Sequence, residues 1–141
     1  MNRVDIAQAI LDALGDGSYL EIGVLTGSSF VPIRAKRKWG VDPAYAFSRR
    51  RIMKYELLSS LGIKTERLFK MASDDFFIAK KKMLTANGIS VCLVDGLHTY
   101  DQSLKDVLNA LDYLKPGGVM GALLAVGGER ARIVFAAGRG E

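Results

Sequence analysis

The chain has 141 residues, of which 49% are hydrophobic and 25% are charged, and its formal net charge is +5 at pH 7. This composition is typical of one globular domain, and no apolar run reaches the roughly 20 residues that a membrane-spanning helix needs. The first residues, Met1–Asp5, lack the pattern of a secretory leader, so a cytoplasmic location is the default expectation. The single cysteine excludes an internal disulfide.

Three short runs of basic residues, at 34–38, 49–51 and 80–82, account for much of the positive charge. Such runs suit an anionic partner when aromatic side chains for base stacking lie between them. No aromatic residue interrupts these runs, and each falls on an expected solvent-exposed part of a helix. The pattern therefore disfavours nucleic-acid binding.

Hydrophobic periodicity predicts alternating helices and strands in a single domain spanning residues 1–141. The expected helices cover residues 4–14, 28–38, 47–61, 75–86 and a segment beginning at 100; the expected strands cover 18–23, 39–43, 63–71, 89–95 and one near 119. Alternation of this kind predicts an α/β fold with an open, mostly parallel, Rossmann-like sheet of five or six strands and helices on both faces. The nearly continuous apolar run at 89–95 is expected at the sheet centre, beside the strand that begins at Tyr19.

The stretch from Tyr19 to Phe30 joins the first strand to a glycine turn. Glu21 stands near the strand end, Gly23 stands where the backbone must turn, and Gly27 stands where the chain would approach a ligand closely. Their spacing, Glu-x-Gly-x-x-x-Gly, differs from the Gly-x-Gly-x-x-Gly pattern of dinucleotide-binding turns. A plain structural turn is the alternative interpretation.

Further polar residues follow the next two strands. Asp42 lies 21 residues after Glu21, the separation expected of one strand–helix–strand unit, and an acid there can accept hydrogen bonds from ribose hydroxyls. The alternative is a turn aspartate before a proline. Ser73 and Asp74 follow the third strand, where they can cap the next helix or contact a ligand.

The segment from Asp95 to Tyr100 follows the central strand and contains a carboxylate, a glycine and the only histidine, His98. Ligands of open α/β sheets bind at this carboxyl edge. Together the glycine turn, Asp42, the run Asp-Gly-x-His-x-Tyr and the later Leu-Lys-Pro-Gly-Gly at 114–118 resemble the class I S-adenosylmethionine-dependent methyltransferases. The later motifs closely resemble those of one subfamily, the bacterial small-molecule O-methyltransferases, and the resemblance covers residues 17–120.

The resemblance implies that S-adenosylmethionine is the cofactor and that a small molecule, through an oxygen, accepts the methyl group. It implies cofactor contacts for the residues Glu21, Gly23, Thr26, Gly27, Ser28, Asp42, Ser73, Asp74 and Asp95. His98 is the candidate catalytic base, because its unperturbed pKa is near neutrality, although a histidine that caps the following helix or packs beneath the loop explains the same position. Asp95 is the second candidate catalytic residue, through contact with the cofactor or with a divalent cation. No metal is expected, because too few ligand-type residues accompany Asp95.

After Met120 the chain departs from the family pattern, because a polar pair and further strands would usually follow. We expect one short strand at 133–136 and a poorly ordered end. Three interpretations stay open: a compact enzyme whose pocket another subunit completes, a cofactor-binding domain without turnover, and a nicotinamide-binding domain. The glycine spacing argues against the last.

Overall fold

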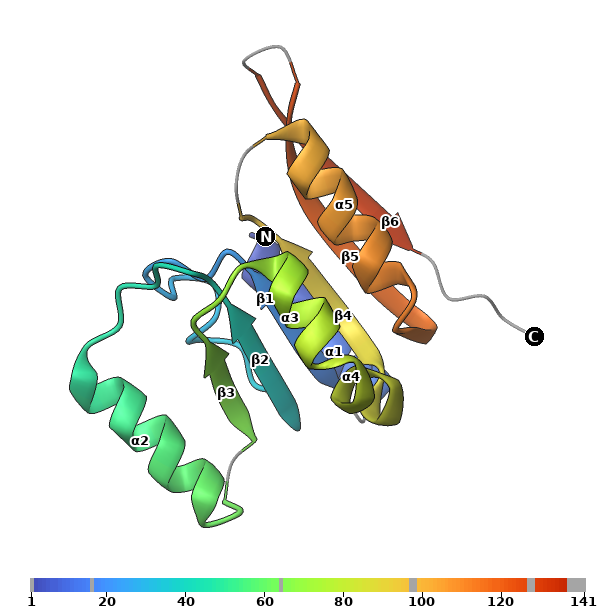
Figure 1. Cartoon of the computed structure of the whole chain (residues 1–141). Coiled ribbons are helices and arrows are strands. Elements are labelled where there is room, and N and C mark those ends of the chain that lie inside the picture. The colour runs from blue at the N-terminus through green and yellow to red at the C-terminus, as the bar shows by residue number, and fades with distance from the viewer. Residues whose placement is uncertain (1, 16, 64, 97–98, 127–128, 137–141) are drawn as a thin grey trace.

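The chain folds into a six-stranded sheet with the order β3-β2-β1-β4-β5-β6 in this computed structural model (Figure 1). The structure describes residues 2–15, 17–63, 65–96, 99–126 and 129–136, with side chains as far as Ala122. The strands are β1 (Ser18–Ile22), β2 (Arg37–Val41), β3 (Glu66–Phe69), β4 (Ile89–Val94), β5 (Leu114–Val126) and β6 (Glu129–Ala136). The helices are α1 (Arg3–Leu14), α2 (Arg49–Ser60), α3 (Ser73–Ala79), α4 (Lys81–Asn87) and α5 (Tyr100–Leu111).

The strands β1 to β5 are parallel, and β6 pairs antiparallel with β5. The α/β fold and the mostly parallel sheet predicted from the sequence are therefore confirmed. The predicted central pair is also present, since β1 pairs with β4 and Glu21 lies opposite Leu93. The chain crosses from β3 at one edge to β4 beside β1, so the strand order reverses between β1 and β4. Ligands bind at such a switch point in open α/β sheets.

Helices cover both faces of the sheet. In Figure 1, α1 lies behind the sheet, whereas α3, α4 and α5 lie in front of it. Each side of the sheet has its own apolar core: one contains Leu11, Tyr19, Phe30, Ile33 and Val91, and the other contains Trp39, Phe76, Leu84, Cys92, Val107 and Met120. The helix α2 lies beside the edge strand β3 and buries none of its residues. No helix in the described part of the chain is long and apolar enough to cross a membrane.

The helix predicted at 28–38 is absent. The glycine turn leads instead into successive turns, and β2 already begins at Arg37. The buried ammonium group of Lys38 donates to the carbonyl oxygens of Phe30 and Ile33, at 3.0 and 2.9 Å, so these carbonyls are bonded to a side chain rather than to helical N–H groups. Two core side chains, Phe30 and Ile33, are thereby fixed in this non-helical segment.

Other boundaries differ less. The helix predicted at 75–86 is split into α3 and α4, which meet at Lys80. The strand predicted at 63–71 is reduced to the four residues of β3. The single short strand predicted at 133–136 is part of the longer β6, and β5 continues to Val126 to pair with it. The expected disorder at 137–141 lies outside the described residues.

Candidate functional site

A cavity of about 360 Å³ lies at the carboxyl edge of the sheet, near the point where the strand order reverses. Its volume falls within the roughly 300–1,000 Å³ of typical small-molecule sites. The lining residues come from the ends of β1, β2 and β4, from the start of α3 and from α5: Ile22, Gly23, Leu25, Val41, Asp42, Pro43, Ala72, Ser73, Asp74, Asp95, Gly96, Gln102 and Asp106. The fold thus brings together five of the residues that the sequence selected: Gly23, Asp42, Ser73, Asp74 and Asp95.

Gly23 lies where β1 meets the end of β4. Its φ angle is +87°, a conformation that residues with a side chain rarely adopt, and its N–H donates to the Val41 carbonyl at 2.8 Å. A β-carbon at this position would lie 2.3 Å from the carbonyl oxygen of Asp95. A glycine is therefore required for both backbone conformation and space, and its lack of a side chain leaves the backbone accessible from the cavity.

Asp42 follows β2 directly and is held in a fixed orientation. Its Oδ2 accepts a hydrogen bond from the Leu25 N–H at 2.8 Å, and its Oδ1 accepts one from the Ala44 N–H at 2.7 Å. A carboxylate offers about four lone-pair positions, so each oxygen keeps acceptor capacity for a ligand. The sequence predicted an acid at this strand end, and the structure adds the two backbone bonds that orient it.

Glu21 has a different environment from the other acids. It lies on the same face of β1 as Tyr19, whose hydroxyl donates to its Oε2 at 2.6 Å, and this face packs towards α1. The carboxylate is 1% exposed and is not part of the cavity lining. Burial raises the pKa of Glu21 from 4.5 to about 7, although the bond from Tyr19 and the charge of Arg3 oppose this shift.

Asp95 stands at the end of β4, where its backbone N–H donates to the Ile22 carbonyl at 2.8 Å. Its carboxylate forms an ion pair with the guanidinium of Arg3 in the first turn of α1. The Asp95 side chain is 16% exposed and the Arg3 side chain 38%. This pair links the N-terminal helix to the rim of the cavity, a connection that sequence spacing does not reveal.

The wall formed by α3 and α5 contains two residues that the sequence analysis missed, Gln102 and Asp106. The amide nitrogen of Gln102 lies 3.1 Å from Asp106 Oδ1, 3.3 Å from Ser73 Oγ and 3.4 Å from Asp74 Oδ1. Asp106 is 1% exposed, and burial raises its pKa. One signal was present in the sequence: Asp106 falls on the apolar face of an amphipathic helix, where an acid is unusual.

Asp74, on the same wall, is paired with Lys105 across 2.6 Å. This hydrogen bond lowers the pKa of Asp74. Among the described residues, four carboxylates therefore line the cavity, those of Asp42, Asp74, Asp95 and Asp106. Arg3 and Lys105 neutralise two of them from outside, and the remaining negative charge favours a ligand with a cationic group.

Three further predicted residues, Thr26, Gly27 and Ser28, do not line this cavity. Gly27, at φ +79°, packs closely against the Phe47 ring, while Thr26 and Ser28 are exposed. His98 lies outside the described residues. In the part of the chain that the structure describes, no three His, Cys, Asp or Glu side chains form a group suited to a metal ion.

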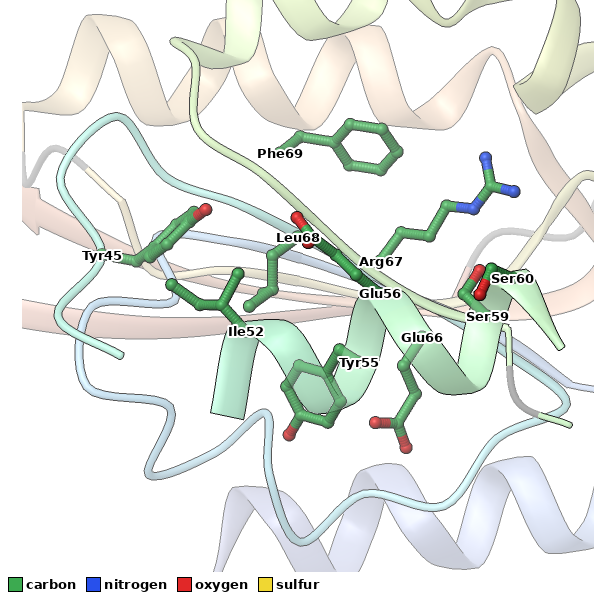
Figure 2. A pocket seen from close by; sticks show the side chains of 10 residues that line it. All are labelled: Tyr45, Ile52, Tyr55, Glu56, Ser59, Ser60, Glu66, Arg67, Leu68 and Phe69. Carbon is green, nitrogen blue, oxygen red and sulfur yellow. The ribbon is translucent and has the colours of Figure 1, made fainter. Parts of the chain in front are cut away.

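A second cavity, of about 330 Å³, lies between α2 and the edge strand β3 (Figure 2). Its lining side chains come from α2, from all four residues of β3 and from Tyr45 in the loop before α2, as Figure 2 shows. Glu56 and Glu66 are its acids and Arg67 is its base. It lies away from the strand-order reversal, so the cavity beside Gly23 is the better candidate for the functional site.

A family model described as a methyltransferase domain matches residues 20–122. The chain belongs to this family of methyltransferase domains. The match runs from β1 into β5 and includes every residue that lines the cavity beside Gly23. No curated protein matches the chain.

Solved methyltransferase structures share the fold of this methyltransferase domain. An rRNA methylase from Streptococcus thermophilus aligns with a TM-score of 0.56 and 16% identity, over 89% of this chain and 70% of its own. The N-methyltransferase NodS from Bradyrhizobium japonicum aligns with a TM-score of 0.53 and 18% identity, over 87% of this chain and 66% of the NodS chain. MycE, a methyltransferase from the mycinamycin biosynthetic pathway solved in complex with Mg and SAH, aligns with a TM-score of 0.54 and 15% identity. This alignment covers 84% of this chain and 30% of the MycE chain. The chain thus spans only 30% of MycE, and these identities show the fold alone.

Proposed function

We propose that this methyltransferase domain binds S-adenosylmethionine and transfers its methyl group to an oxygen of a small-molecule acceptor. The observation that supports the proposal best is the juxtaposition of Gly23 and Asp42 in one cavity at the strand-order reversal. One residue leaves the backbone accessible, and the other offers oriented acceptors. The family match and the SAH complex of MycE support the same cofactor class.

The cavity residues fit the parts of this cofactor. Asp42 would accept hydrogen bonds from the ribose hydroxyls, since both of its oxygens are oriented and keep free lone pairs. The backbone of 21–28 would hold the methionine part of the cofactor. The Glu21 side chain would contribute its charge from the opposite face of β1, the face that packs towards α1. Ser73 and Asp74 would lie beside the adenine. The acidic lining suits the positive charges of the sulfonium and the amino group.

When bound, the cofactor supplies an activated methyl group, so the protein's task is mainly to position the acceptor and remove a proton. We assign the proton acceptor to a ring nitrogen of His98, which follows β4 in the sequence. The strand β4 itself ends at the carboxyl edge of the sheet. The unperturbed pKa of a histidine is near neutrality, as a base at physiological pH requires. Asp95, anchored by Arg3, would line the same edge.

Calorimetric titration with S-adenosylmethionine, S-adenosylhomocysteine and NAD tests the cofactor assignment. We expect heat of binding with the first two ligands and none with NAD. Binding of NAD alone would overturn the proposal in favour of a nicotinamide-binding domain. Transfer of labelled methyl groups to a panel of phenols, catechols and amines then tests turnover. Cofactor binding without transfer to any acceptor would instead indicate a binding domain, and transfer to amines alone would contradict the oxygen acceptor.

A further inference from the structure

We propose that the outward face of α2 binds a membrane surface rich in anionic lipid. This contact would be peripheral, with the helix lying along the headgroups rather than crossing the bilayer. It concerns a part of the molecule away from the cavity beside Gly23 and does not depend on the cofactor that this cavity binds.

The helix α2 has two different faces. Its inward face lines the cavity between α2 and β3 and includes Ile52, Tyr55 and Glu56 (Figure 2). Residues at spacings of three and four lie on one side of a helix. On the outward face of α2 these residues are Arg50, Met53, Lys54, Leu57 and, at the helix end, Leu61.

The apolar side chains of the outward face are exposed to an unusual extent. Met53 is 66% exposed, Leu57 59% and Leu61 61%. Ile63, in the turn after α2, is 65% exposed. The helix buries none of its residues and lies at the margin of the molecule in Figure 1. Large apolar side chains that gather on one exposed face mark an interaction surface.

The charges on this face decide the kind of partner. Arg50 and Lys54 lie among the apolar side chains, and Arg49 and Arg51 adjoin them; all four cations are exposed. Within α2, which the structure describes throughout, the only acid is Glu56, and it lines the inner cavity. The complement of the outward face is therefore both anionic and apolar. A bilayer with anionic headgroups above its acyl chains has both properties.

The types of side chain favour a fluid surface over a partner of fixed shape. Lysine and arginine can extend to headgroups while their aliphatic stems, with leucine and methionine, contact the acyl chains. Protein interfaces are typically anchored by tyrosine or tryptophan as well as arginine, and single-stranded nucleic acids stack on aromatic rings. The one aromatic residue of α2, Tyr55, lines the inner cavity instead.

Sedimentation of the full chain with lipid vesicles tests the proposal. We expect binding to mixed vesicles of phosphatidylglycerol and phosphatidylcholine, little binding to pure phosphatidylcholine, and weaker binding as the NaCl concentration rises. Arg50→Gln/Lys54→Gln should bind the mixed vesicles about 25-fold more weakly, because each cation near an anionic surface contributes about a fivefold factor. Met53→Gln/Leu57→Gln should bind them about tenfold more weakly, because apolar contact is lost. Glutamine is a good helix former, so α2 should persist in both variants.

Lys81→Gln/Lys82→Gln is the matched control. It removes two exposed cations from α4, so its net charge equals that of Arg50→Gln/Lys54→Gln. Its binding should stay close to that of the unmodified chain. Equal weakening in the two charge variants would show attraction by net charge alone and overturn the proposal. Unchanged binding in Met53→Gln/Leu57→Gln, or no binding to the mixed vesicles, would also overturn it. Binding to double-stranded DNA but not to these vesicles would identify a nucleic acid as the partner instead.

A fluorescent label reports which face makes the contact. The one cysteine of the chain, Cys92, is buried, so Leu57→Cys introduces the accessible thiol. An environment-sensitive dye on this thiol should shift its emission to the blue when mixed vesicles are added. The same dye after Thr85→Cys, at an exposed position of α4, should not shift. A shift only after Thr85→Cys would place the contact on another face and contradict the role of α2.

Discussion

A β-carbon added to Gly23 would lie 2.3 Å from the carbonyl oxygen of Asp95, so the ends of β1 and β4 meet at a glycine that no other residue can replace without movement. The positive φ of Gly23 adds a second requirement for glycine. Residues at the ends of both strands line the cavity, so a change at their junction alters the site as well as the fold.

Gly23→Ala should therefore destabilise the protein strongly. The left-handed conformation alone costs roughly 1–2 kcal/mol for alanine, and the steric conflict should add about 1–3 kcal/mol. Gly62→Ala is the control, since Gly62 has φ +68° but open space around its β-carbon position. Urea unfolding of the two variants measures the difference, and equal losses would show that the contact between the strand ends is unimportant.

Asp42→Ala should weaken both cofactor binding and stability. The substitution removes the acceptor for the N–H groups of Leu25 and Ala44, and it removes the proposed acceptor for ribose hydroxyls. Hydrogen bonds to a charged group contribute about 1.5–3 kcal/mol each, so we expect at least a tenfold loss of affinity for S-adenosylhomocysteine in the folded protein. Calorimetry gives the affinity, and thermal unfolding separates it from the loss of stability. An affinity equal to that of the unmodified protein would remove the ribose assignment.

The sequence was sufficient to predict the sheet, because its strands are short apolar runs with local signals. The run Ile89–Val94 is buried along nearly its whole length, as its composition predicted. The acid Asp42 was also predicted at a strand end, although β1 is joined to β2 by turns and not by the helix on which the spacing argument relied. These features depend on local pattern and on the geometry of parallel sheets.

The sequence was not sufficient where a distant side chain decides the outcome. The segment 28–38 has a plausible helical pattern, yet Lys38 binds its carbonyl groups and stabilises turns. The contact of Gln102 with Ser73 joins residues from different helices, and no spacing rule connects them. The ion pair between Arg3 and Asp95 is equally non-local.

Lys38→Met should test this account of the turn segment. The Lys38 side chain is 1% exposed, and its ammonium donates to three carbonyls and lies 3.3 Å from Glu66 Oε1. Removing one partner of a buried ion pair typically costs about 3–5 kcal/mol, so we expect a loss of that order in the free energy of unfolding. Urea unfolding measures it, with the exposed Lys81→Met as control. Part of the loss should return in Lys38→Met/Glu66→Gln, and equal stability of Lys38→Met and Lys81→Met would contradict the account.

Glu21 should make stability fall as the pH rises from about 4.5 to 7. Below pH 4.5 the Glu21 carboxyl is protonated in both the folded and the unfolded chain. Between pH 4.5 and 7 the unfolded chain loses this proton, whereas the folded chain keeps it, because burial raises the pKa of Glu21 to about 7. The penalty is complete above pH 7 and amounts to about 3 kcal/mol at most. In Glu21→Gln, which keeps an acceptor for Tyr19, this decline should disappear. Urea unfolding of both proteins at pH 5, 6, 7 and 8 gives the difference in their free energies of unfolding at each pH. Asp106 is present in both proteins, so its own contribution to the pH dependence cancels in this difference. Parallel pH profiles would show that Glu21 ionises normally.

His98→Ala should separate cofactor binding from turnover. If His98 removes the proton from the acceptor oxygen, the variant should bind S-adenosylhomocysteine with normal affinity but transfer the methyl group roughly 10²–10⁴-fold more slowly. A histidine that only caps the following helix would give a different result, a stability loss of about 1 kcal/mol with a nearly normal rate in the folded fraction. Measuring transfer with an acceptor found in the panel, alongside thermal unfolding, distinguishes the two roles.

The pH dependence of the same reaction gives an independent check on His98. A histidine base must be neutral to accept a proton, so the rate of the unmodified protein should rise with pH through the pKa of the imidazole and then level off. In His98→Gln this rise should be absent, because the amide does not titrate. Glu21 has a pKa of about 7 and is therefore the group most easily mistaken for the histidine. If the rise in rate with pH persists in His98→Gln and disappears in Glu21→Gln, the titrating group is the buried Glu21 carboxyl. That result would contradict the role assigned to His98.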